Sequence, residues 1–428
     1  MGRFSGFRAV FRGFRARRIW GSGQKPFSLA LCLCLNIITE ISERELYMPT
    51  GIIVGFRVTR FQFRRDRTVG DSQVAAEQAN IVALELSDDA GRTGLGFMQV
   101  LFQPTPAEDE IARIFREEAF GALEGRGAGP IALGVTRPRG GNVRAMSLPF
   151  EEAIQQAAWD LFAKSNGQPL WALLGRKRDA VPVYASGLDF HLSDHDFSEL
   201  FGAAAAQGYR GYKIKVGHAE VERDLHRLDL LKKAVGDDGR PVMIDANEAW
   251  TAAEAKAALD LFARAGHRIY WIEDPLPRAD FDGLRLLRQT HFGARVNSGE
   301  YLGLSGKRAL LEAKACDMLN VHGQVSDVMR AGWLAGEHNV EVTFGNSFLE
   351  IGVNMALALP GVRWLEYSFQ NFEHLVEEPF TIRDGLIHGS RAPGHGLVLS
   401  EAARLHDRRP TPLAQDALGD APRWKRPS

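Results

Sequence analysis

Three acidic residues, each at the end of a short apolar run, have types and spacing that could bind a metal ion. Asp245, Glu273 and Glu300 close the runs VMID, IYWIE and RVNSGE, at intervals of 273 − 245 = 28 and 300 − 273 = 27 residues. Carboxylates brought close together stay ionised only with a cation between them, and an oxygen-only ligand set favours Mg²⁺. The alternative, that each acid is a rim residue paired with Lys or Arg, is weakened by the succession of three.

Two lysines in the stretch RGYKIKVG (210–217) share one face of a predicted strand. Side chains alternate along a strand, so Lys213 and Lys215 point the same way. Like charges disfavour protonation, so a neighbouring lysine could keep one amine neutral and make it a general base. The alternative is a pair of solvated lysines on an edge strand.

The elements that position these residues are predicted from about Asp179 onward, where strand-like runs alternate with helical patterns. Eight such runs indicate a parallel α/β barrel, whose active groups lie at the carboxyl ends of the strands. A doubly wound open sheet is the alternative, and it is less favoured because no glycine-rich phosphate fingerprint follows any strand. The predicted strands lie in 181–187, 212–217, 242–247, 269–274, 295–300, 318–323, 340–346 and 364–368.

A smaller α+β domain is predicted before the barrel. Residues with β-branched and aromatic side chains fill 51–63, and an Asp-Asp-Ala-Gly turn joins two apolar runs in 79–97. Helical patterns follow, and the last segment of the chain is expected to pack back on this domain. The boundaries we predict are 1–47, 48–178, 179–370 and 371–428.

The first 47 residues differ in character from the rest. They are rich in Arg and Phe and contain an apolar run too short to span a bilayer. A signal peptide, an Arg-rich transit peptide and a translation start at Met48 are the three explanations. We favour the start at Met48, because strand-like order begins directly after it, and we expect 1–47 to be disordered or not native.

Composition excludes some classes of partner. The net charge of −1 and the pI of about 6.9 give no overall attraction to nucleic acid or to an anionic membrane. Cys32, Cys34 and Cys316 provide neither a disulfide framework nor a zinc spacing. A reducing cytoplasm is the expected location.

Together, these motifs resemble the enolase superfamily, and within it the mandelate racemase/muconate lactonizing enzyme group. The resemblance covers nearly the whole chain from about Gly51. It rests on KIK, DANEAW, WIEDPL and SGEYL, with AAWDLFAKSNGQPLWALLG and PGHGLVLS as further landmarks. It implies a modified (β/α)₇β barrel of the TIM type, under a capping domain built from the N-terminal region and the C-terminal tail. It also implies a small carboxylate substrate and a homo-oligomer.

The resemblance implies a role for each matching residue. Asp245, Glu273 and Glu300 would bind Mg²⁺. Lys215 would abstract the proton next to the substrate carboxylate to give an enediolate, which the metal would stabilise. Lys213 would lower the pKa of Lys215.

Among the last three predicted strands, the eighth carries a residue that matches the group, whereas the sixth and seventh carry residues that differ from it. Glu366 matches an acid of the eighth strand, which would hydrogen-bond the substrate carboxylate if it is protonated. Members of the group carry a second base as a His on the seventh strand or a Lys on the sixth, where this chain has Asn346 and His322. This departure favours a one-base dehydration in which His322 is the acid that expels a β-hydroxyl. The alternative for His322 is a structural histidine bonded to the backbone.

Candidate substrate-binding positions lie at strand ends and in capping loops. Asn247 shares a strand face with Asp245, and Asn346 could bind a substrate hydroxyl. Asp189 and His191 follow the first barrel strand and could enter the site. The capping loops expected to reach the substrate are 63–73 and 97–104.

We therefore predict an Mg²⁺-dependent lyase that dehydrates an acid sugar, an aldonate or aldarate, to a 2-keto-3-deoxy acid. A racemase, epimerase or cycloisomerase shares the first step and is the alternative. Two other classes stay open: a homologue that has lost catalysis and senses a ligand, and a Schiff-base aldolase using Lys213 or Lys215, which would need no metal.

Overall fold

The structure is a computed structural model of the chain. It describes residues 51–100, 104–134, 146–290, 293–345, 351–369 and 372–406. The predictions for segment 1–47 and for Asn346 lie outside the described residues, as do residues 101–103 of the second capping loop.

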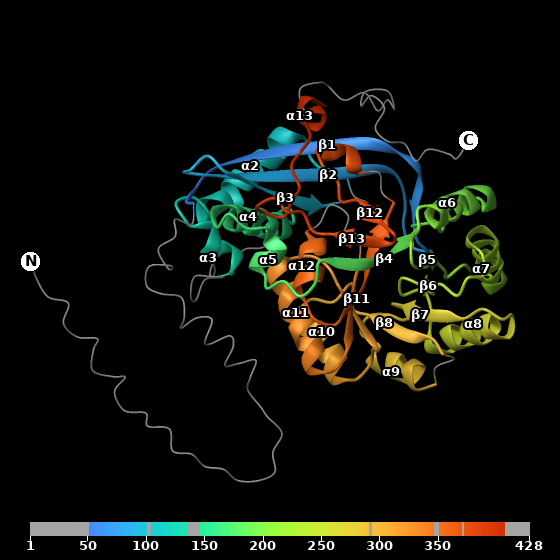
Figure 1. The fold of residues 1–428 in the computed structure, drawn as a ribbon. Coiled ribbons are helices and arrows are strands. Elements are labelled where there is room, and N and C mark those ends of the chain that lie inside the picture. Colours follow the sequence, from blue (N-terminus) through green and yellow to red (C-terminus); the bar gives the residue numbers. More distant parts are fainter. Residues whose placement is uncertain are drawn as a thin grey trace, which may run out of the picture. The chain divides into compact units, whose positions relative to one another are not determined.

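The N-terminal domain is a three-stranded antiparallel sheet with helices on one side (Figure 1). The predicted turn is present, because Asp88 and Arg92 close it by a backbone bond and the Asp88 carboxylate accepts from the Ala90 and Arg92 N–H groups. The strands are β1 (Ile53–Gly70), β2 (Ala75–Asp88) and β3 (Thr93–Gln99). The helices are α2 (Glu108–Glu118), α3 (Ala128–Ala132), α4 (Glu151–Ser165) and α5 (Leu170–Leu173), with a 3₁₀ turn, η2, at Phe120–Ala122.

Strand β2 is apolar on both faces because both faces are covered. Val82 and Leu84 belong to the main core, which includes residues of α4. Ile81 and Ala83 point the other way and pack against the C-terminal tail. The sheet is therefore the middle layer between α4 and the tail.

The predicted parallel barrel is confirmed. Each of the eight predicted runs forms a strand, and β11 pairs with β4 to close the sheet, which excludes the doubly wound alternative. The barrel strands are β4 (Ala180–Ser186), β5 (Tyr212–Lys215), β6 (Val242–Asp245), β7 (Ile269–Glu273), β8 (Arg295–Ser298), β9 (Met318–Val321), β10 (Glu341–Phe344) and β11 (Val362–Ser368).

Helices surround the barrel strands (Figure 1). Several begin at residues that satisfy the first free N–H groups: Ser193 and Thr251 accept from the third residue of α6 and α8, and Asp280 does the same for α9. No helix among the described residues is long and apolar enough to cross a membrane. The helices are α6 (Asp194–Ala206), α7 (Val221–Val235), α8 (Ala252–Arg264), α9 (Phe281–Gln289), α10 (Leu304–Glu312), α11 (Val325–Glu337) and α12 (Gly352–Ala358).

The described part of the tail contacts both domains. Strand β13 (Leu386–His388) pairs with β12 (Ile382–Arg383) and with barrel strand β4, and both pairings are antiparallel. The remainder, with η3 (Glu373–Leu375) and α13 (Glu401–His406), packs on the N-terminal sheet through an apolar cluster.

Buried His395 ties the tail to the N-terminal sheet. Its Nδ1 accepts the Leu397 N–H at 3.0 Å, and its Nε2 lies 2.7 Å from the Leu95 carbonyl, so the ring is neutral with its proton on Nε2. Burial lowers the pKa of His395 below the usual 6.5.

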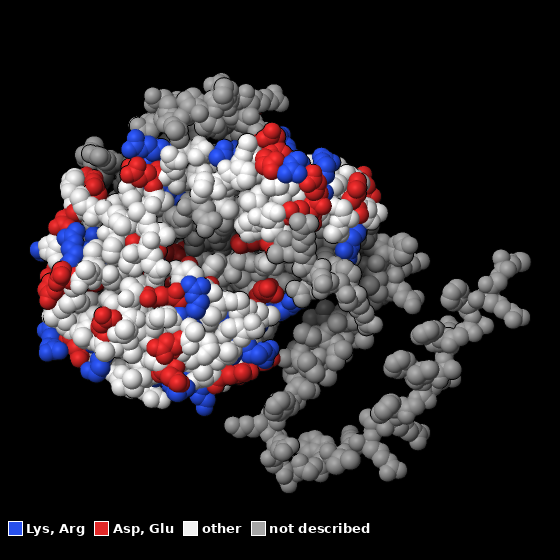
Figure 2. Space-filling model, turned by 180° about the vertical axis from the view of Figure 1, so that it is seen from behind, with Lys and Arg blue, Asp and Glu red and all other residues white. Residues whose placement is uncertain are grey.

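Surface charges agree with the near-zero net charge. On the face that Figure 2 shows, Lys and Arg side chains are interspersed with Asp and Glu. That face of the described residues presents no field of a single sign.

Candidate active site

Strand register brings the predicted basic and acidic residues to one level of the barrel. In the parallel pairing, Lys215 lies opposite Asp245, and Asp245 lies opposite Glu273. Glu300 follows the end of the next strand, β8. Adjacent parallel strands therefore present these four side chains at the same carboxyl-terminal mouth, as the barrel prediction requires.

The three acids form a compact group of oxygen ligands. One carboxylate oxygen from each of Asp245, Glu273 and Glu300 lies within 4.8 Å of the others. Asp245 and Glu273 are fully buried and Glu300 is partly buried. Carboxylate oxygens at such separations match the ligand preference of a hard divalent cation. The donor set of this chain therefore fits Mg²⁺.

Lys213 is surrounded by carboxylates inside the barrel. Its Nζ lies 2.5 Å from Glu273 Oε1, 3.0 Å from Asp245 Oδ2 and 3.2 Å from Glu366 Oε1. Lys213 is 1% exposed, so its charge is balanced by these acids and not by water. Glu366, on β11, the eighth strand of the barrel, thus contacts Lys213.

Lys215 lies next to Asp245 and the amide of Asn247. Its Nζ is 2.7 Å from Asp245 Oδ2 and 2.7 Å from Asn247 Oδ1. The amide nitrogen of Asn247 donates to the Tyr301 hydroxyl at 2.6 Å. Asn247 Oδ1 therefore orients Lys215 and its Nδ2 contacts Tyr301, and the role of Asn247 in substrate binding stays a prediction.

Lys213 lowers the pKa of Lys215, as predicted, but the carboxylates around Lys215 act in the opposite direction. Burial and the neighbouring ammonium lower the pKa of Lys215, but Asp245 and the other carboxylates outweigh them and raise it above the usual value. For Asp245, burial acts to raise the pKa, yet the two ammonium groups lower it to about 2. Burial and then the Asp245 charge raise the pKa of Glu300 to about 8.

Sequence reasoning missed a set of donors around Glu273. The Trp271 indole and the Asn297 amide donate to Oε2 at 3.1 and 2.9 Å, and the Asn320 amide donates to Oε1 at 3.1 Å. With Lys213, they hold both oxygens of this carboxylate in one orientation. Strand alternation could have indicated two of them, because Trp271 and Asn320 lie two residues before Glu273 and His322.

Asp189 is not free to bind substrate, contrary to the prediction. It is fully buried, and its Oδ2 lies 2.5 Å from the Arg227 guanidinium. Its other oxygen accepts the backbone N–H of Lys215 at 3.2 Å. The charge of Asp189 is therefore neutralised by α7, and its role here is to hold the Lys215 backbone.

The first capping loop reaches the barrel rim. The Gln73 amide donates to the Asn247 carbonyl, and Nε2 of the exposed His191 lies 2.9 Å from the Val74 carbonyl. His191 thus bridges the barrel to the loop, and its role in substrate binding stays a prediction. The Ser72 hydroxyl is buried and has no hydrogen-bond partner among the described residues.

His322 lies beside Glu300 but is poorly suited to the predicted acid role. Its Nε2 is 3.2 Å from the Glu300 carbonyl, and Nδ1 is buried without a partner in the described part of the chain. Burial, and then the charge of Lys307, lower its pKa to about 4. The ring is therefore neutral at pH 7, with Nδ1 as an acceptor, so it cannot donate a proton as an imidazolium.

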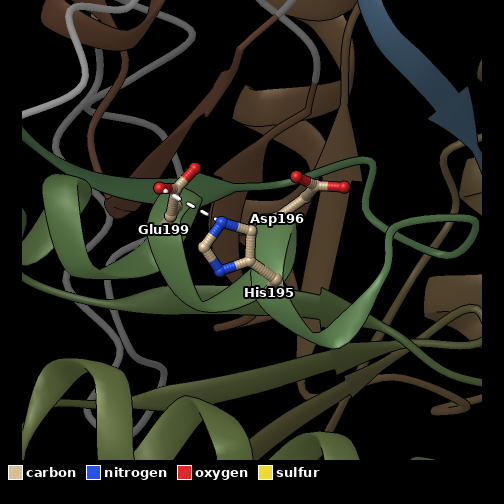
Figure 3. A group of neighbouring side chains, drawn as sticks. All are labelled: His195, Asp196 and Glu199. Carbon is tan, nitrogen blue, oxygen red and sulfur yellow. Dashed lines mark ion pairs between the residues drawn. The ribbon is translucent and has the colours of Figure 1, made fainter.

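A second group of possible metal ligands lies on the surface of α6. Figure 3 shows His195 facing Glu199 across one turn of the helix, with Asp196 beside them. His195 Nε2 lies 3.4 Å from Glu199 Oε1. His195 and Asp196 are exposed, and the Asp196 carboxylate accepts the Ser193 hydroxyl at 2.7 Å. These contacts are those of a capped helix start, and the buried group in the barrel remains the better cation site.

Comparison with known proteins agrees with this architecture. Residues 196–403 match the family described as enolase C-terminal domain-like. A solved structure of a mandelate racemase-like protein from Mesorhizobium loti is 54% identical, covers 87% of this chain and 98% of its own, and superimposes with a TM-score of 0.80. The chain belongs to the enolase superfamily, in the mandelate racemase/muconate lactonizing enzyme group.

Relatives within the superfamily catalyse several reactions. The 3,6-anhydro-α-L-galactonate cycloisomerase of Streptomyces coelicolor is 28% identical, over 74% of this chain and 89% of its own. The L-talarate/galactarate dehydratase of Salmonella typhimurium is 30% identical, over 60% and 65%. A racemase from Streptomyces coelicolor, solved with bound magnesium, is 26% identical with a TM-score of 0.69, over 81% and 97%. This chain is thus related to lyases and isomerases.

Proposed function

We propose that the protein is an Mg²⁺-dependent lyase that dehydrates an acid sugar, an aldonate or aldarate, to a 2-keto-3-deoxy acid. The observation that carries the proposal is the position of the Lys215 amine, 2.7 Å from Asp245 Oδ2 in a buried group of three carboxylates. Support for an acid-sugar substrate comes from dehydratases among the relatives, including one solved with magnesium and L-glucarate.

Asp245, Glu273 and Glu300 hold the cation in this proposal. When bound, the cation supplies positive charge that offsets these carboxylates and stabilises the negative charge that develops on the substrate carboxylate as the α-proton leaves. Trp271 and Asn297 keep the Glu273 carboxylate in place.

Lys215 removes the α-proton at its neutral Nζ and becomes an ammonium group. A cation held by the three carboxylates would offset the negative charge that raises the pKa of Lys215, and would so favour the neutral amine. Asn247 Oδ1 and the Asp189 contact to the Lys215 backbone orient that nitrogen. The β-hydroxyl leaves as water after taking a proton, and the same Nζ can return one. His322 Nδ1, a neutral acceptor, is placed to bind a substrate hydroxyl.

A cycloisomerase or epimerase is the second candidate. It is favoured by the relationship to the Streptomyces coelicolor cycloisomerase, of which this chain covers 89%. These reactions share the first step at Lys215 and differ in where the negative charge is quenched. A Schiff-base aldolase is disfavoured because Lys213 and Lys215 both bind buried carboxylates.

The test is a screen of sugar acids in deuterated water with Mg²⁺. Formation of a 2-keto-3-deoxy acid from any of them supports the lyase. Deuterium at the α-carbon without loss of water would instead indicate an epimerase. Opening of a ring in the substrate without loss of water would indicate a cycloisomerase. Activity that survives a chelator would overturn the metal-dependent mechanism, and no reaction across a broad panel would favour the sensor.

A further inference from the structure

Two buried charged side chains bind the peptide groups of Gly299, the residue before Glu300. The Gly299 N–H donates to Asp274 Oδ1 at 3.0 Å, and the Gly299 carbonyl accepts from the Lys307 ammonium. Asp274 is 2% exposed and Lys307 is 5% exposed. The backbone N–H and carbonyl of Gly299 are thus bound by side chains of opposite charge.

Lys307, on α10, makes no ion pair with a carboxylate among the described residues, although the charges of Asp274 and Glu300 act on it. Its Nζ donates instead to the main-chain carbonyls of Gly299 and Asn320, the latter at 3.1 Å. Burying an ammonium without a paired carboxylate is costly. A lysine in this position therefore indicates a specific requirement for these two carbonyls.

The contacts lie where the sheet bonding between β8 and β9 stops. The last paired residues are Ser298 and Leu319, and Lys307 joins the two strands one residue further on. Gly299 has a φ of +114°, and a Cβ there would lie 3.1 Å from Leu319 Cδ1. The chain thus leaves the ladder in a conformation suited to glycine, directly before Glu300.

We propose that Lys307 and Asp274 are positioning residues, which hold the Gly299 peptide and thereby fix where the Glu300 carboxylate meets the cation. The proposal rests on the proposed function only for the identity of that cation. Contacts that orient metal ligands without touching the metal commonly change metal affinity by 10- to 100-fold.

The experiment compares Lys307→Met with Arg308→Met, which removes an exposed cation from the next position of the same helix. Mg²⁺ affinity is measured by calorimetry, and backbone deuterium uptake of the 299–303 segment by mass spectrometry, both on the full chain. We expect Lys307→Met to weaken Mg²⁺ binding at least tenfold and to speed exchange in 299–303 at least fivefold, with Arg308→Met unchanged. A purely structural role would lower stability without changing the Mg²⁺ affinity of the folded protein.

A folded Lys307→Met protein with wild-type exchange in 299–303 and Mg²⁺ affinity within twofold would overturn the proposal. Lys307→Gln, which keeps an N–H donor, provides a second variant if the methionine variant does not fold. It should show smaller changes in Mg²⁺ affinity and in exchange of 299–303, in the same direction. No change in either measurement would also overturn the proposal. If wild-type protein binds no Mg²⁺, the proposed function fails, while the exchange measurement still tests the contact.

Discussion

Replacing Lys215 with alanine tests the assignment of the base. The only other lysine of β5, Lys213, is held by three carboxylates and cannot take over. General-base catalysis is commonly worth about 10²–10⁴ in rate. Because α-proton exchange at the proposed site depends on this one amine, we expect a loss at the upper end, about 10⁴-fold or 5.4 kcal/mol.

The same substitution should leave the fold intact. Nζ of Lys215 makes two charge-assisted hydrogen bonds, to Asp245 and Asn247, each worth about 1.5–3 kcal/mol. Lys213 remains 3.0 Å from Asp245 and continues to balance its charge. Removing a buried ammonium also relieves its desolvation cost. We therefore expect the free energy of unfolding to fall by about 1–3 kcal/mol.

The assay follows exchange of the α-proton in deuterated water by NMR, with a sugar acid that the wild-type protein turns over. Mg²⁺ affinity, measured by calorimetry, should be unchanged or tighter, since the three carboxylates remain and a nearby positive charge is gone. Lys233→Ala, at an exposed lysine of α7, is the control. A folded Lys215→Ala protein with more than about 1% of wild-type exchange would refute the base assignment.

Three further predictions concern the metal site, the histidine beside it and the tail. Glu300→Gln should weaken Mg²⁺ binding in calorimetry by more than the roughly 10- to 100-fold that the loss of an outer contact commonly costs, because a charged ligand itself is lost; an Mg²⁺ affinity within twofold of wild type would exclude Glu300 as a ligand. His322→Asn should slow dehydration yet leave α-proton exchange, since the neutral ring binds substrate and does not take the α-proton; equal loss of both rates would contradict this role. The pKa of His395 is lowered in the folded protein, so the unfolded chain binds a proton more readily. The contribution of His395 to the free energy of unfolding is therefore complete above the unfolded-state pKa of about 6.5. It declines as the pH falls below that value, by at most about 1.4 kcal/mol per pH unit. Denaturant midpoints between pH 8 and 5 should show a flatter profile for His395→Gln, and identical profiles would exclude the effect.

Local sequence rules were sufficient to predict which strands carry the site residues and which way their side chains point. The inward faces of Lys213 and Lys215 follow from strand alternation, and the shared level of Asp245 and Glu273 follows from parallel pairing of similar strand–helix units. These rules act within one strand or between neighbours. They therefore identify which side chains meet at the barrel mouth.

Charge states and hydrogen-bond partners needed the three-dimensional structure. Asp189 follows a strand and was predicted to bind substrate, yet Arg227, which is 38 residues away on α7, neutralises it. Lys213 lowers the pKa of Lys215 as predicted, but the prediction left out the carboxylates, led by Asp245, that raise it. Both contacts escaped the prediction because electrostatic balance depends on all charges within a few ångströms, from elements whose distance the sequence does not encode locally.

Counting the buried charges explains why these residues favour a divalent cation. Four carboxylates, those of Asp245, Glu273, Glu300 and Glu366, face the ammonium groups of Lys213 and Lys215. With all four ionised, two negative charges lack a counter-charge, and burial makes such an excess costly, which is the main reason that the pKa values of Glu273 and Glu300 are raised. One divalent cation cancels that excess, whereas a monovalent ion would leave half of it. With that cation in place, the carboxylates would no longer raise the pKa of Lys215 as strongly, and loss of its proton would give the neutral amine that the proposed mechanism needs.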